Sequence, residues 1–140
     1  MTYLPDEHHL GRFVSNGKIV RDNTDKAIRF IPQAFELRAN EEYLSSSWLE
    51  FFSGDKTQQV VKTIQAMKDG GLTIKKGSAV GVYNVGKFKS ACEKYGSKVR
   101  IIHEPEPNNP AYTAIRNYPR DVQELFSLLA ETAEIFETAA

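Results

Sequence analysis

The chain is poor in cysteine and histidine, and this limits its metal and redox chemistry. It has one cysteine, Cys92, and three histidines among 140 residues. A single cysteine excludes an internal disulfide, and no zinc-finger or zinc-ribbon spacing occurs. We therefore predict neither a bound metal nor a cofactor.

Long apolar runs and a net charge are also missing. No apolar run approaches the length of about 20 residues that spans a bilayer, and residues 1–10 lack the charged-then-apolar pattern of a signal peptide. The 18 lysines and arginines balance the 18 aspartates and glutamates, whereas a nucleic-acid-binding domain is normally strongly basic. We expect a soluble, cytoplasmic protein with no membrane contact, for which nucleic acid is not the favoured partner.

The two signs of charge nevertheless collect in different stretches of the chain. Residues 75–100 are mainly basic and residues 104–140 mainly acidic. Lysines near a helix start can attract phosphate, so an anion-binding face is one interpretation. The interpretation that we favour is a solvated basic helix face beside an acidic one.

Motifs that name a reaction do not occur either. The sequence has no G-x-S-x-G, H-E-x-x-H, P-loop or G-x-G-x-x-G pattern. Cys92 falls on the apolar side of a predicted helix, where a thiol behaves as a small hydrophobic group and not as a nucleophile. The sequence therefore leaves open whether the protein is an enzyme.

The stretch from Ser78 to Pro105 carries the strongest structural pattern. Residues 79–83 are apolar and rich in β-branched side chains, Asn84 can cap the helix that follows, and a second apolar run covers residues 99–103. About a dozen residues separate the two runs, which is enough for a crossover helix but too many for a tight hairpin. We predict two neighbouring parallel strands joined by a right-handed crossover, a βαβ unit at about 79–103.

The remaining elements complete a predicted α+β fold in a single domain, residues 1–140, with a mixed sheet. The Asn16-Gly17 pair predicts an N-terminal hairpin, and an apolar stripe beginning after Pro119 predicts a long C-terminal helix. The expected ranges are hairpin strands at 12–14 and 18–20, strands at 27–31, 34–37, 44–48 and 72–74, helices at 55–69 and 119–138, and one or two helical turns at 111–118.

One group of candidate site residues follows from the predicted parallel pair. Asn84 ends the first strand and His103 the second, and ligands gather beyond the carboxyl ends of parallel strands. With Lys87 at the helix start, these residues would face one crevice. The alternative is that Asn84 is only a helix cap and His103 only a strand end.

A second group lies in the N-terminal half. Arg12, Arg38 and Trp48 are set among apolar neighbours, as are Arg29 and Gln33, which is how a ligand cleft is usually lined. They could equally be rim arginines and a core tryptophan. His8 and His9 would point to opposite sides of an extended chain, so each is a candidate proton carrier alone and not half of a metal site.

Two functional hypotheses from different classes result. The first is a small binding or regulatory module that acts through a protein partner or as a homo-oligomer, with the broad apolar stripe of the C-terminal helix as the contact. The second is a small enzyme, or a nucleotide- or nucleic-acid-binding protein, that uses the crevice of Asn84, Lys87 and His103.

Overall fold

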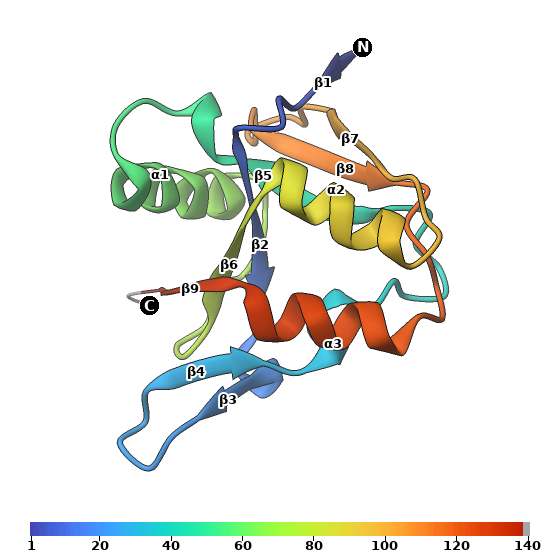
Figure 1. Cartoon of the computed structure of the whole chain (residues 1–140). Coiled ribbons are helices and arrows are strands. Elements are labelled where there is room, and N and C mark those ends of the chain that lie inside the picture. The colour runs from blue at the N-terminus through green and yellow to red at the C-terminus, as the bar shows by residue number, and fades with distance from the viewer. Residues whose placement is uncertain (139–140) are drawn as a thin grey trace.

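Seven antiparallel strands form the central sheet of the computed structural model, which describes residues 1–138 (Figure 1). The strand order is β1-β7-β8-β5-β2-β6-β9, and β3 and β4 form a separate hairpin that projects from the body. The strands are β1 (Thr2–Tyr3), β2 (His9–Val14), β3 (Ile19–Arg21), β4 (Ala27–Phe30), β5 (Leu44–Trp48), β6 (Ala79–Asn84), β7 (Arg100–His103), β8 (Tyr112–Arg116) and β9 (Glu134–Glu137).

Three helices cover the two faces of this sheet. They are α1 (Lys56–Asp69), α2 (Val85–Lys94) and α3 (Gln123–Thr132). The larger core lies between the sheet and the pair α2 and α3, and the smaller core lies between the opposite face and α1. Strand β6 serves both cores, because Val80 and Val82 point to α1 while Ala79 and Tyr83 point to the larger core. The α+β class is confirmed, in a three-layer arrangement.

The two helix starts with clear capping residues are where the sequence predicts them. Asp55 accepts a hydrogen bond from the backbone N–H of Gln58, whose side chain returns one to Asp55, so α1 begins with a capping box. Asn84 caps α2 through the backbone N–H of Lys87, and Gly96 follows the helix with φ 89°. Strand β5 also has its predicted bounds.

The prediction of a βαβ unit is wrong in one essential respect. Successive antiparallel pairings give β6 and β7 the same direction, but β2, β5 and β8 lie between them. Helix α2 therefore crosses three strands instead of joining neighbours. The sheet is antiparallel and not mixed, and the two strand ends that were to form the crevice are far apart in strand order.

The prediction of an N-terminal hairpin at Asn16-Gly17 is also wrong. Residues Asn16–Lys18 form a 3-10 turn that takes the chain out of the main sheet, and β3 then pairs with β4. A tight two-residue hairpin of the expected type needs positive φ at both central residues. Neither Asn16 nor Gly17 has positive φ. Residues Pro32–Phe35 form a second 3-10 turn where a strand was expected.

The predicted C-terminal helix is too long. Helix α3 ends at Thr132, Ala133 is extended, and β9 pairs with β6. Ile135 packs on the larger core and Phe136 on the smaller one, as neighbouring residues of a strand between two cores do. In the sequence the same two apolar residues also fit a helical stripe, so the pattern did not separate the two structures. Residues 112–116, expected to be helical, form β8, and residues 72–74 are in no strand.

In the described part of the chain, no helix combines the length and the apolar character needed to cross a membrane.

Close packing of the β3–β4 hairpin on β6 makes Gly81 sensitive to substitution. A Cβ atom there would lie 2.7 Å from Cε2 of Phe30, a ring that is fully buried. We expect Gly81→Ala to lower the free energy of unfolding by about 1–3 kcal/mol in urea titrations, as other overpacked cores do. Gly17→Ala, with no atom within 4 Å of its Cβ, is the control and should change stability by less than about 0.5 kcal/mol. Equal stability of both variants would show that Phe30 does not cover Gly81.

Candidate functional site

The central sheet is split between β2 and β5. Two residue pairs join these strands, Leu10 with Trp48 and Gly11 with Ser47. Residues 12–14 of β2 pair with β6 and not with β5. A cavity of about 460 Å³ lies at this split. Residues from β2, β5, β8, α1 and several of the connecting loops line it, so segments distant in the sequence meet there.

Arg12 fills the split in place of backbone pairing. Its Nε donates to the carbonyl oxygen of Ala34 (2.8 Å) and its Nη1 to the carbonyl oxygen of Ser45 (2.8 Å). The half-buried guanidinium thereby ties β2 to β5 and to the 3-10 turn at Pro32–Phe35. Both oxygens are neutral acceptors, so these bonds use Nε and Nη1 but pair the positive charge with no carboxylate.

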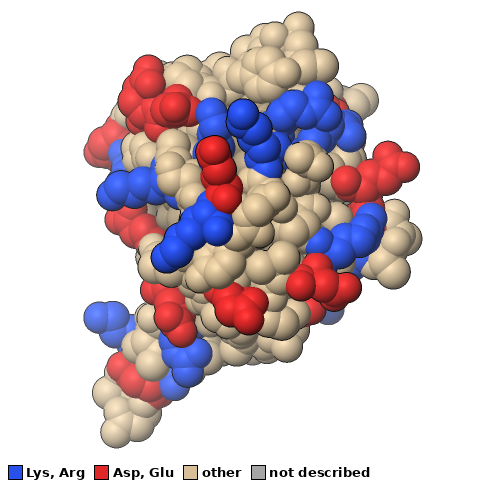
Figure 2. Space-filling model, turned by 45° about the vertical axis from the view of Figure 1, so that its right-hand side comes forward, with Lys and Arg blue, Asp and Glu red and all other residues tan. Residues whose placement is uncertain are grey.

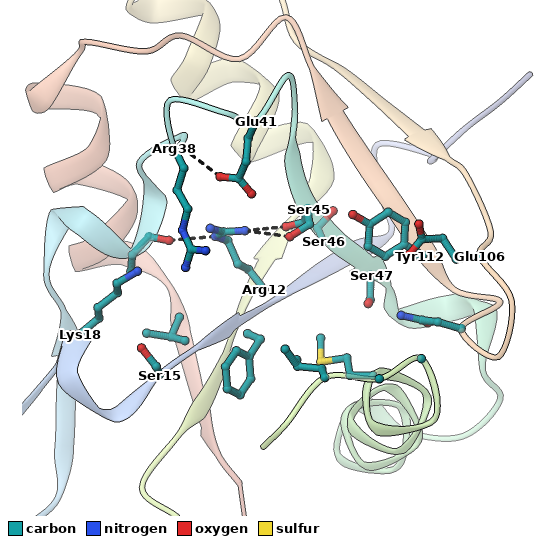
Figure 3. Close-up of a pocket in the computed structure, with 18 residues that line it drawn as sticks. Arg12, Ser15, Lys18, Arg38, Glu41, Ser45, Ser46, Ser47, Glu106 and Tyr112 are labelled. Carbon is teal, nitrogen blue, oxygen red and sulfur yellow. Dashed lines mark hydrogen bonds between the residues drawn. The ribbon is translucent and has the colours of Figure 1, made fainter. Parts of the chain in front are cut away.

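Two more cationic side chains lie at the same end of the cavity. Figure 3 shows the charged groups of Lys18, Arg38 and Arg12 in a row, with Arg38 directed at Arg12. Within residues 1–138, neither the Arg38 guanidinium nor Nζ of Lys18 has a protein hydrogen bond or ion pair. Three positive charges therefore share one space.

The protonated forms of Lys18 and Arg12 are disfavoured in the folded protein. Burial lowers the pKa of Lys18, and repulsion from Arg38 and Arg12 lowers it further. Burial likewise lowers the pKa of Arg12, although arginine stays charged at any physiological pH. The cost of holding the three cations together would fall if an anion lay between them.

A fourth arginine fixes the loop that carries Arg38. Arg120 donates from Nη1 to the carbonyl oxygen of Arg38 (3.1 Å) and from Nη2 to that of Glu41. Glu41 in turn accepts the backbone N–H of Arg38 (2.9 Å). The turn at residues 38–41 is thus held on both sides, and this positions the Arg38 side chain at the cavity.

The rest of the cavity wall is less polar. Four apolar side chains come from β2 and from the end of α1 and the residues after it: Phe13, Val14, Met67 and Leu72. Asn109 also lines the cavity, and its buried Oδ1 has no hydrogen-bond partner among residues 1–138. Glu106 and Tyr112 complete the side opposite Lys18 (Figure 3).

Asn84 and Lys87 line a different cavity, of about 510 Å³, and there they meet His9 and not His103. Glu50 holds His9 by accepting its backbone N–H (2.7 Å) and bonding its Nδ1 (2.6 Å). Because a carboxylate oxygen only accepts, Nδ1 of His9 donates the proton of this bond. The bond to Glu50 fixes the His9 ring, which is the group in this cavity that proton-transfer chemistry would use.

The start of α2 has no free donors to assist such chemistry. The backbone N–H groups of Val85, Gly86 and Lys87 bond to the oxygens of His8, Asp6 and the Asn84 side chain. The Asn84 amide also donates to the Asp6 carbonyl (3.0 Å). Asn84 thus acts as a helix cap that fastens the N-terminal segment, which is the alternative weighed for it above.

The other two histidines pack on Trp48. The indole Nε1 donates to Nδ1 of His8 (3.0 Å), and the ring of His103 lies 5.2 Å from that of Trp48. Nε2 of His103 donates to the carbonyl oxygen of Pro110 (2.6 Å). Trp48, His8 and His103 form an aromatic cluster with Phe51 and do not line the cavity at the split.

Two further sequence-based interpretations concern Cys92 and the charged stretches. Cys92 is fully buried, and burial raises the pKa of its thiol to about 12, so it is not a nucleophile at neutral pH. Figure 2 shows positive and negative side chains interspersed over the face that it presents. That face has no long track of one sign of the kind that follows a nucleic-acid backbone.

Sequence reasoning found part of the charged cavity. Arg12 and Arg38 were named, whereas Lys18, Ser45 and Arg120 were not, because nothing local shows that the 3-10 turn brings Lys18 next to Arg38. Arg29 and Gln33 lie outside the cavity. Among residues 1–138, no three His, Cys, Asp or Glu side chains are grouped so that they could hold a metal ion.

Comparison of the chain with protein-family models, with curated proteins and with solved structures gives no match.

The role of Arg12 in joining the strands can be tested while its charge is kept. A lysine has one point-like donor group and cannot reach both carbonyls in the same fork. We expect Arg12→Lys to lower the free energy of unfolding by about 1–3 kcal/mol, the typical cost of leaving buried acceptors unpaired. Arg29→Lys, at an exposed arginine of β4, is the matched control. If chemical denaturation gives equal stabilities for both variants, Arg12 does not hold the split together.

Proposed function

We propose that this domain binds a small organic anion in the cavity between β2 and β5. The observation that supports the proposal most strongly is the convergence of Arg12, Arg38 and Lys18 on one space without a carboxylate paired to any of their charged groups. Like charges in a partly dehydrated cavity repel one another, so a bound anion would stabilise this arrangement.

The contrast with other arginines of the same chain supports this proposal. Arg116 makes two hydrogen bonds to Glu104 (2.7 Å each), and Arg21 pairs with Glu137 (2.8 Å). Both of these arginines are thus paired with carboxylates. Arg12 bonds only to neutral oxygens, so it keeps a charge that can act on a ligand.

The protein-partner hypothesis has less support from the fold. Its contact surface was to be the apolar stripe of the C-terminal helix, but Leu125, Phe126 and Leu129 are buried in the larger core. The enzyme hypothesis needed Asn84, Lys87 and His103 in one crevice, but His103 does not line the cavity of Asn84 and Lys87. The backbone N–H groups at the start of α2 also have partners already. Anion binding is therefore the function that we propose.

Lys18 offers a test in which stability and binding change in opposite directions. Its lowered pKa means that the charged form is disfavoured in the folded state, a penalty that is present at neutral pH and disappears as the pH rises through that pKa. Lys18→Met should therefore raise the free energy of unfolding of the free protein by a few tenths to about 1 kcal/mol. It should also weaken binding of benzoate, used as the probe anion, by about three- to tenfold.

The pH dependence of benzoate affinity provides the second measurement. Affinity should fall in the wild type as the pH rises through the lowered pKa of Lys18, and stay nearly flat in Lys18→Met. Lys26→Met, at an exposed lysine beyond β3, is the matched control and should leave both stability and binding unchanged. The proposal fails if titration calorimetry detects no benzoate binding to the wild type, or if Lys18→Met binds benzoate as well as Lys26→Met does.

A further inference from the structure

We infer that the ligand of this cavity is a monocarboxylate with an apolar body, and not a phosphate or a small hydrophilic dianion. This inference rests on the proposed function and specifies the chemical class of its ligand. It follows from three properties of the cavity: its charge balance, the donors that remain free, and the position of its apolar wall.

The charges that line the cavity favour a single negative charge on the ligand. Arg12, Arg38 and Lys18 are opposed by Glu41 and Glu106, which leaves one net positive charge. Figure 3 shows the Glu41 carboxylate directed towards the arginines, so a ligand held by the cations would also lie close to it. A second negative charge on the ligand would meet this repulsion without a further cation to balance it.

The free donors also suit a small, flat acceptor group. Nε and Nη1 of Arg12 are used by the Ala34 and Ser45 carbonyls, so only Nη2 has no partner among residues 1–138. The whole Arg38 guanidinium has none either, and its planar fork matches the two oxygens of a carboxylate. The same fork also fits two oxygens of a phosphate, so the distinction from phosphate rests on the charge balance and on the apolar wall.

The apolar wall lies away from the cations. Phe13 follows Arg12 in β2, so its side chain points to the opposite face of the sheet, the face that α1 covers. Met67 and Leu72 belong to the end of α1 and the segment after it. In Figure 3 the green helix α1 and the Arg38 guanidinium lie on opposite sides of Arg12. A molecule bound by its carboxylate would therefore extend its other end along Phe13, Met67 and Leu72.

Exposure of Leu72 supports the same assignment. Leu72 is 40% exposed although it lines the cavity. A large apolar side chain at the edge of a pocket gains stability when a ligand covers it. An inorganic anion at the arginines would not reach this side chain, whereas a chain or ring of several carbons would.

A series of straight-chain carboxylates tests the inference. Acetate, butyrate and hexanoate are titrated into the 140-residue chain, with affinity taken from amide and arginine Nε–H chemical shifts in NMR spectra. We expect affinity to rise by up to about fourfold for each added methylene, since each buried CH₂ contributes by this factor. Hexanol, which lacks the charge, should bind at least about tenfold more weakly than hexanoate, and inorganic phosphate more weakly than hexanoate.

Two variants separate the charged end from the apolar end. Arg38→Gln should weaken every carboxylate by a similar factor, leaving the chain-length dependence unchanged. Leu72→Ser should leave acetate unchanged and reduce the gain from acetate to hexanoate. Val61→Ser is its matched control, because Val61 is a 61%-exposed residue of α1 outside the cavity.

The outcomes distinguish this inference from the proposed function. If phosphate or acetate binds at the arginines as tightly as hexanoate, the anion site stands and the assignment to apolar carboxylates is wrong. If no anion in the series shifts the resonances of Arg12 or Ser45, both are wrong. A hexanoate preference that Leu72→Ser diminishes and Val61→Ser does not would support the inference.

Discussion

The half-buried guanidinium of Arg12 determines the shape of this domain around its cavity. A charged group in a partly dehydrated place must have hydrogen-bond partners, and Arg12 finds them in the carbonyls of Ala34 and Ser45. Those carbonyls belong to different segments, so one side chain joins β2, β5 and the turn at Pro32–Phe35. Backbone pairing between β2 and β5 stops at Gly11, and the cavity lies where the strands separate.

The β3–β4 hairpin supports this arrangement by packing on β6, the strand that pairs with β2. Gly81 of β6 lies opposite Arg12 in the register, and its missing side chain leaves room for the ring of Phe30. Phe30 ends β4 and is followed almost at once by the turn that presents the Ala34 carbonyl. A glycine in a central strand thus allows the packing that supplies one of the partners of Arg12.

Local signals in the sequence located β5 and the starts of α1 and α2, but the long-range order of the strands could not be read from them. Asp55 and Asn84 mark helix starts because capping depends on residues three positions away. The order of strands between β6 and β7 depends on no such signal. Four strand spacings cover roughly 19 Å, which a ten-residue helix of about 15 Å with its loops can cross, so the same crossover fits neighbouring or distant strands. Arg12 and Arg38 stood out among apolar neighbours, whereas Lys18 reaches them only through the fold.

The mutual repulsion of Arg12, Arg38 and Lys18 also explains why the charged end of the cavity is better understood as a binding site than as a structural device. Arg116, by contrast, is paired with Glu104. Here burial and like charges both lower the pKa of Lys18, so the free protein loses stability at this point. Sequences keep such a local conflict where a ligand resolves it, because a ligand that binds only the folded state returns stability that grows with the logarithm of its concentration.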